Sequence, residues 1–105
     1  MTQPATKTVI VTEKVIADDV IAVIEEMGAS GYTITPTGGK GARGVRSTSS
    51  RAQVIDAFSN VKIDVITAEK AMGERIADAV ADRFFTNYSG IVYLEQVEIL
   101  RPHKF

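Results

Sequence analysis

The sequence predicts a single α+β domain, residues 1–105, in which one antiparallel sheet carries two helices on the same face. Three observations predict this class. The chain has 105 residues, a length typical of one domain. Short segments rich in β-branched residues alternate with two longer segments of helical periodicity. Their order is strand, helix, strand, strand, helix, strand, so the chain consists of two similar halves.

The first half contains a strand, a helix and a second strand. Lys7–Thr12 is short and β-branched, which predicts a buried strand. Glu13–Met27 carries apolar residues at helical spacing, and we expect Gly28 to cap the helix that they form. The residues on its apolar face are Ile16, Val20, Ile24 and Met27. Tyr32–Thr35 predicts the second strand. Pro36 has no N–H for a ladder, so this strand ends there or lies at a sheet edge.

The second half repeats this order. Val61–Thr67 alternates apolar and polar residues, which is typical of a strand. Ala68–Phe85 predicts a helix whose apolar residues recur every fourth position, at Met72, Ile76, Val80 and Phe84. Ile91–Leu100 predicts one final strand, or two strands joined by a bulge near residues 95–96. The whole pattern predicts a ferredoxin-like βαββαβ sandwich.

The second face of the predicted sheet needs a cover of its own. Valine, isoleucine, leucine and tyrosine occur at both parities of the strands, and we expect Tyr93 to be packed. Short patterns produce such overlap by chance, but the interpretation that we favour is burial of this face by contacts between subunits.

Composition excludes several kinds of protein. The net charge is -1, so no global field draws the chain to nucleic acid or to acidic membranes. There is no cysteine, which excludes disulfides, thiolate catalysis and cysteine-ligated metals. The sequence shows neither a signal peptide nor an apolar run long enough to span a membrane. We therefore expect a soluble, cytoplasmic protein that meets a membrane only through a partner.

A glycine-rich segment carries the local positive charge. Thr37–Arg51 is poor in apolar residues and predicts a flexible loop of about residues 37–57. No acidic residue lies between Glu26 and Asp56, whereas the basic residues there are Lys40, Arg43, Arg46 and Arg51. Glycine lets backbone N–H groups approach a phosphate, and lysine and arginine bind its oxygens. The segment is therefore a candidate phosphate-binding loop.

The alternative is a solvated loop whose charges only keep the chain soluble. Residues 38–41 read Gly-Gly-Lys-Gly, which is not a Walker A motif, because the spacing differs and no Ser or Thr follows Lys40. No helix follows the glycines, as a dinucleotide-binding fingerprint requires. The residues alone leave both alternatives open.

Three stretches carry a resemblance to a known family. They are Val9–Lys14 (VIVTEK), Gly31–Arg46 (GYTITPTGGKGARGVR) and Asn87–Tyr93 (NYSGIVY). They resemble the PII-like carbon-sensing proteins called SbtB, the cyanobacterial regulators of the sodium-dependent bicarbonate transporter SbtA. The resemblance runs from about Thr6 to Leu100. It implies a homotrimer that binds cAMP, AMP, ADP and ATP in the clefts between subunits.

The resemblance also implies roles for individual residues. The long loop would be the T-loop, which responds to the nucleotide and engages SbtA through Ala42, Gly44, Val45 and Ser47. The residues expected to bind nucleotide are Gly39, Lys40, Gly41, Arg43, Arg46, Gly90, Thr12, Glu13 and Tyr88. Of these, the three basic residues would meet the phosphates and Gly90 would lie beside the adenine. We expect no permanently bound cofactor, although Ca²⁺ or Mg²⁺ could accompany ATP.

Other functions have weaker support. The only histidine is His103, in the tail, and the carboxylates of Glu74, Asp78 and Asp82 fit a solvated helix face, so we expect neither catalysis nor a dedicated metal site. A small nucleotide phosphohydrolase is the alternative, because loop arginines can stabilise a phosphoryl transition state. Nucleic-acid binding is disfavoured, because the predicted strands at 7–12 and 61–67 lack the aromatic residues that stack bases.

Overall fold

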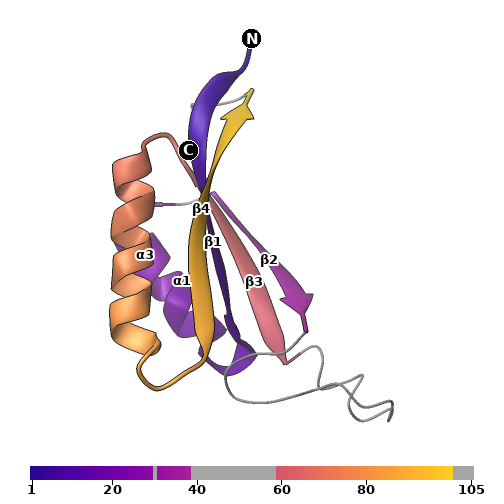
Figure 1. Ribbon diagram of the computed structural model, residues 1–105, viewed down its shortest axis with the longest axis vertical. Coiled ribbons are helices and arrows are strands. Elements are labelled where there is room, and N and C mark those ends of the chain that lie inside the picture. The colour runs from indigo at the N-terminus through magenta and orange to yellow at the C-terminus, as the bar shows by residue number, and fades with distance from the viewer. Residues whose placement is uncertain (30, 39–58, 101–105) are drawn as a thin grey trace.

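The computed structural model describes residues 1–29, 31–38 and 59–100. Within them, strands and helices follow the predicted order (Figure 1). The elements are β1 (Gln3–Glu13), the 3₁₀ helix η1 (Lys14–Ile16), α1 (Ala17–Glu26), β2 (Tyr32–Thr37), β3 (Asn60–Thr67), α3 (Lys70–Phe84) and β4 (Gly90–Ile99).

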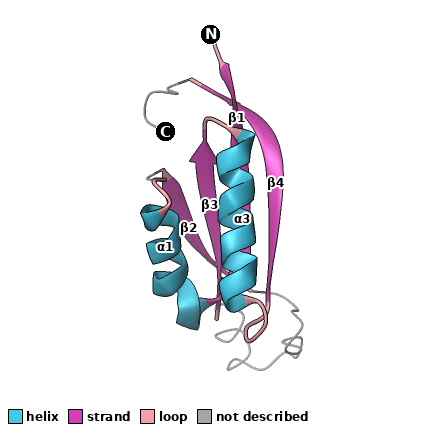
Figure 2. Cartoon of the chain, turned by 90° about the vertical axis from the view of Figure 1, so that its left-hand side faces the viewer, coloured by secondary structure: helices cyan, strands magenta, loops and turns pink. Residues whose placement is uncertain are grey.

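The four strands form one antiparallel sheet in the order β2-β3-β1-β4. Both helices lie on the same side of this sheet, as Figure 2 shows. Helix α1 connects β1 to β2 and α3 connects β3 to β4, so each half of the chain is a strand–helix–strand unit. The ferredoxin-like βαββαβ sandwich predicted from the sequence is confirmed.

The core lies between the sheet and the two helices. In β3, Val61, Ile63 and Val65 are buried, and their alternation with half-buried residues confirms the period predicted for this strand. The helices contribute the buried residues that their spacing predicted, including Val20, Ile24, Ile76 and Val80. Each such side chain contributes about 1.5 to 3 kcal/mol through burial. This layer fixes the helices on the sheet.

Helix α1 ends as its sequence predicts. Gly28 has a φ of 93°, a conformation that glycine adopts without steric cost. Its N–H donates to the carbonyl of Glu25 at 3.0 Å, and the N–H of Ala29 donates to the carbonyl of Ile24 at 3.2 Å. This pair of bonds is a Schellman motif, in which the last turn of the helix satisfies its own carbonyl groups.

Several boundaries differ from the prediction. Strand β1 is longer than Lys7–Thr12, because its first residues pair with the end of β4. The helix predicted from Glu13 begins as a 3₁₀ turn and becomes an α-helix only at Ala17. Strand β4 keeps an unbroken register against β1, so the alternative of one final strand is confirmed and the alternative of a bulge near residues 95–96 is not.

The second strand also runs further than predicted. Pro36 lies inside β2, opposite Val61, and Thr37 pairs with Asn60. The proline is tolerated because β2 is an edge strand, which was one of the two alternatives. The loop predicted from residue 37 therefore starts after Thr37, and the rest of it lies almost wholly outside the described residues.

Helix α3 crosses β1 closely at Gly73. A Cβ at this position would lie 2.7 Å from the Oγ1 of Thr8 and 3.1 Å from the Cγ2 of Thr6. Real Cβ atoms do not approach other atoms so closely, so the absence of a side chain sets the distance between helix and sheet.

Gly73→Ala should therefore destabilise the protein although alanine favours helix formation. Overpacking costs about 1 to 3 kcal/mol, and the gain in helix propensity offsets about 1 kcal/mol of it. Urea unfolding at fixed protein concentration measures the difference. Thr8→Ala in the same chain should recover part of the loss, because it removes the closest atom, whereas Glu74→Ala on the exposed face should change stability by less than about 0.5 kcal/mol. A more stable Gly73→Ala protein would contradict the close packing.

Candidate functional site

One terminus of each of the four strands lies at the same end of the sheet. Strand β1 ends where β3 and β4 begin, since Glu13 is opposite Asn60 and Thr12 is opposite Gly90. Strand β2 ends at the same place, since Thr37 is also opposite Asn60. This end of the sheet is the lower one in Figure 1. It brings together parts of the chain that are far apart in sequence, and we call it the loop end.

A small hydrogen-bond network joins β1 to the turn before β4. The Oε2 of Glu13 accepts from the backbone N–H of Ser89 at 2.8 Å and from its hydroxyl at 3.4 Å. The buried hydroxyl of Thr12 donates to the carbonyl of Ser89 at 2.8 Å. Both polar groups of the Ser89 backbone are therefore held by adjacent residues of β1. The network fixes the conformation of the chain that leads into Gly90.

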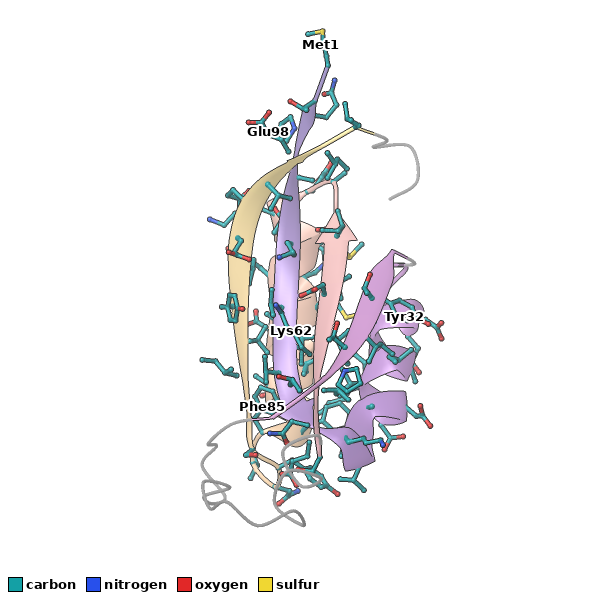
Figure 3. All side chains as sticks on the ribbon, turned by 90° about the vertical axis from the view of Figure 1, so that its right-hand side faces the viewer. Met1, Tyr32, Lys62, Phe85 and Glu98 are labelled. Atoms are coloured by element: carbon teal, nitrogen blue, oxygen red, sulfur yellow. The ribbon has the colours of Figure 1, made fainter. Side chains whose placement is uncertain are left out.

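The turn between α3 and β4 lies next to this hydrogen-bond network. The N–H groups of Asn87 and Tyr88 both donate to the carbonyl of Phe84, at 3.1 and 2.9 Å. A Cβ at Gly90 would collide with the ring of Phe85 and would lie 3.0 Å from the carbonyl oxygen of Val11. Figure 3 labels Phe85 at this end of the sheet. Tyr88 is 37% exposed, so its ring remains available at the surface.

The structure gathers four predicted site residues at the loop end, namely Thr12, Glu13, Tyr88 and Gly90. The remaining ones lie outside the described residues: Gly39, Lys40, Gly41, Ala42, Arg43, Gly44, Val45, Arg46 and Ser47. The described flanks of that segment reach the loop end. The N–H of Lys14 donates to the carbonyl of Ser59 at 2.7 Å, and Asn60 pairs with both Glu13 and Thr37. The basic segment therefore begins and ends beside the four described residues.

Sequence reasoning missed Ser89 and Phe85. Both lie in or next to the turn that precedes β4, but their roles depend on backbone hydrogen bonds and on the space left by Gly90. The available signal was Gly90 itself. It is a glycine at the start of a strand, and the aromatic pair Phe84-Phe85 precedes it in the same short turn region, which indicates close packing.

The carboxylate of Glu13 is the charged group that contacts the Ser89 turn. The shorter bond of the Glu13 carboxylate goes to a backbone N–H, so the carboxylate holds the turn more closely than it approaches the Ser89 hydroxyl. Within residues 1–29, 31–38 and 59–100, no cluster of His, Cys, Asp and Glu could hold a metal ion. In those same ranges, no helix has the length and hydropathy needed to cross a membrane.

A tyrosine hydroxyl with a raised pKa lies at the opposite end of the sheet. The hydroxyl of Tyr32 donates to the Oε2 of Glu25 at 3.0 Å. This hydrogen bond to a carboxylate raises the pKa of Tyr32 above its ordinary value of 10.0. Tyr32 begins β2, whereas Thr37 reaches the loop end, so this phenol is remote from the candidate site.

Comparison with known proteins identifies a family pattern along nearly the whole chain. The family model described as "Nitrogen regulatory protein P-II" matches residues 5–104. A putative PII-like signalling protein from Thermus thermophilus is 30% identical, with a TM-score of 0.78, over 99% of this chain and 97% of that one.

Two structures of the PII-like protein CPII from Thiomonas intermedia share the fold. The one bound to ADP and bicarbonate has a TM-score of 0.80 at 22% identity, over 100% of this chain and 97% of that one. The one bound to ADP, AMP and acetate has a TM-score of 0.73 at 20% identity, with the same coverage.

Removing the carboxylate of Glu13 should loosen the turn at Ser89. Glu13→Ala removes the acceptor of the Ser89 N–H, which costs about 1 to 2 kcal/mol locally, so the Ser89 amide should exchange its hydrogen about tenfold faster or more. Glu13→Gln keeps an acceptor oxygen and should retain most of the protection. Hydrogen exchange followed by NMR measures both, with the amide of Tyr88 as the internal control. Equal exchange at Ser89 in all three proteins would mean that Glu13 does not hold the turn.

Proposed function

Since the chain belongs to the nitrogen regulatory protein P-II family, whose model matches residues 5–104, we propose that it is a PII-like protein that senses adenine nucleotides and signals their level to a bicarbonate transporter. Its ligands are cAMP, AMP, ADP and ATP. Its effector is the sodium-dependent transporter SbtA, which it meets through the loop between β2 and β3.

One observation carries the nucleotide proposal. Thr12, Glu13, Tyr88 and Gly90 come from two separate segments, yet they lie at the same end of the sheet as both flanks of the basic glycine-rich segment. This juxtaposition supports a pocket with these four residues on one side and cations on the other. The absence of a side chain at Gly90 leaves room for the ring of Phe85, and Lys40, Arg43 and Arg46 supply the charge that phosphates need. CPII, which shares the fold, binds ADP and AMP, and this supports an adenine nucleotide as the ligand.

The proposed active form is a homotrimer with a nucleotide in each cleft between subunits. The face of the sheet away from the helices supports this assembly, since it exposes Ile91 by 59% and Tyr93 by 39% in the single chain. The packing predicted for Tyr93 is thus not found within one described chain, and contact with another copy would supply it. The second wall of each nucleotide cleft would come from that copy.

The proposed mechanism is a shift between loop conformations. A nucleotide changes the signal only if it binds one conformation of the loop more tightly than the others. SbtA must also prefer some of these conformations, through Ala42, Gly44, Val45 and Ser47. The protein would then be cytoplasmic and would associate reversibly with the membrane through the transporter. Calcium or magnesium could bind through the phosphates of ATP rather than through a protein cluster.

We propose that the protein has no enzymatic activity. The alternative is a small nucleotide phosphohydrolase in which the Ser89 hydroxyl attacks the phosphorus and passes its proton to Glu13, the P–O bond to the nucleotide breaks, and water then releases the phosphate from Ser89. Incubation of each nucleotide with the protein, followed by chromatography, tests this alternative. Product that forms in the wild-type protein and is absent in both Arg46→Ala and Ser89→Ala would establish it.

Calorimetric titration with the four adenine nucleotides tests the sensor proposal. We expect about one nucleotide per subunit, with ATP measured with and without Ca²⁺ and Mg²⁺. Arg46→Ala should weaken binding by about tenfold to a hundredfold, because a hydrogen bond to a charged group contributes about 1.5 to 3 kcal/mol. Arg75→Ala, on the exposed side of α3, is the matched control and should bind like the wild type. If none of the nucleotides binds, the sensor proposal is wrong.

The transporter proposal needs a separate measurement. Purified SbtA in lipid nanodiscs should bind the wild-type protein, and the affinity should depend on which nucleotide is present. Deletion of residues 42–47 should abolish this binding. Ala22→Ser on the exposed surface of α1 should leave it unchanged. Binding that survives the deletion would mean that another surface contacts the transporter.

A further inference from the structure

Two residues of the proposed nucleotide site have polar groups that are already engaged within the chain. Thr12 is 2% exposed, and its hydroxyl donates to the carbonyl oxygen of Ser89 at 2.8 Å. The Oε2 of Glu13 accepts from the backbone N–H of Ser89 at 2.8 Å. Both side chains are therefore directed at the segment between α3 and β4, residues 85–89, which we call the Ser89 turn.

The Ser89 turn is held at both of its ends. Helix α3 holds its start, because the N–H of Tyr88 donates to the carbonyl oxygen of Phe84 at 2.9 Å. Strand β1 holds its end, because Thr12 and Glu13 bind the two backbone groups of Ser89. Loss of the bonds from β1 would release the chain between Tyr88 and Gly90 while the helix still held the start of the turn.

The turn itself presents the accessible part of this side of the site. The ring of Tyr88 is 37% exposed, whereas Thr12 is buried beneath the turn. A buried hydroxyl that already donates its proton offers little surface to a ligand. Direct contact with a nucleotide therefore falls to the turn more readily than to the residues of β1 that hold it.

We infer that Thr12 and Glu13 are positioning residues, which hold the Ser89 turn in the conformation that binds the nucleotide and do not contact the nucleotide themselves. This inference rests on the proposed function and deepens it. It assigns the contacts on this side of the site to the turn and to Gly90, and it gives β1 the role of keeping them in place.

Positioning affects affinity through the population of the competent conformation. The apparent affinity falls in proportion to the fraction of molecules whose turn has the binding conformation. A released turn must be ordered again when the ligand binds, and that ordering opposes binding. Both bonds end on one residue, so removal of either bond acts on the same segment.

Calorimetric titration with AMP tests this role. Thr12→Val removes the hydroxyl with little change of shape, and Glu13→Ala removes the acceptor. Each should weaken AMP binding by about tenfold. Thr12→Ser keeps a hydroxyl and Glu13→Gln keeps an acceptor oxygen, so both should retain most of the affinity. Circular dichroism checks that each variant is folded.

The opposite end of the sheet provides a matched control for each change. The hydroxyl of buried Thr67 donates to the carbonyl oxygen of Glu69 at 2.9 Å. The carboxylate of Glu25 accepts from the hydroxyl of Tyr32 at 3.0 Å. Thr67→Val and Glu25→Ala remove equivalent groups far from the loop end and should leave the affinity for AMP unchanged.

The double variant Thr12→Val/Glu13→Ala distinguishes a shared route from independent contacts. If both residues act through the Ser89 turn, the double variant should lose less affinity than the product of the two single losses, because a turn that one change has released has less left to lose. Two independent contacts with the nucleotide would multiply their losses. A double loss equal to that product would contradict the positioning role.

Nucleotide analogues test direct contact by Glu13. The analogues are 2′-deoxy-AMP, 3′-deoxy-AMP and the purine ribonucleotide that lacks the amino group. Positioning predicts that Glu13→Ala weakens AMP and every analogue by the same factor, since none of these ligand groups meets the carboxylate. A smaller loss for one analogue would identify the group that Glu13 contacts and would refute the inference. This series decides the inference even if Thr12→Val fails to fold.

The outcomes separate this inference from the proposed function. If the wild-type protein binds none of the four adenine nucleotides, the sensor proposal is wrong and the positioning role is wrong with it. If the wild type binds AMP and the folded variants Thr12→Val and Glu13→Ala bind it equally well, the positioning role alone is refuted. The sensor proposal would then stand, with the Ser89 turn as a structural feature only.

Discussion

The pairing of β1 on both of its edges is the constraint on which the rest of the structure depends. Because β1 hydrogen-bonds to β3 on one side and to β4 on the other, its register fixes where both neighbours begin and end. That register places Thr12 and Glu13 beside Gly90 and Asn60. A slip of one residue would move every side chain of a strand to the other face of the sheet. It would move the core residue Ile10 to the face away from the helices.

The same strand connects the core to the candidate site. Its even-numbered residues pack under α3, and its last two residues hold the Ser89 turn. Strand β1 therefore fixes the position of the Ser89 turn. Loop-borne groups at this end are then presented by a rigid base, an arrangement that binding sites commonly use. The sheet face away from the helices and the loop end both include residues of β1 and β3, so the proposed assembly and the proposed nucleotide site involve the same strands.

The fold was predictable because periodicity reports burial directly. Val61, Ile63 and Val65 alternate, and Ile76 and Val80 recur every fourth residue, so the sequence distinguished strand from helix in both halves. Boundaries were less predictable, because β1 and β4 extend each other through pairing over a long sequence separation. Pro36 illustrates the same limit, since only the sheet order determines that β2 is an edge.

The site was predictable in part. Thr12, Glu13, Tyr88 and Gly90 were identified through the resemblance, and the structure brings them together, although their binding roles remain a proposal. Ser89 could not be found from sequence, because its importance comes from backbone groups that two side chains satisfy.

The proline in the outer strand has a consequence for how the protein behaves at high concentration. An exposed sheet edge is a template on which a foreign strand can align and begin a fibril. At Pro36 the backbone has no N–H to offer such a strand, and Thr33 and Thr35 nearby are polar. The outer strand on the other side carries Glu95 and Glu98, whose charges oppose the stacking of identical chains. Both edge strands of the sheet therefore oppose fibrous aggregation.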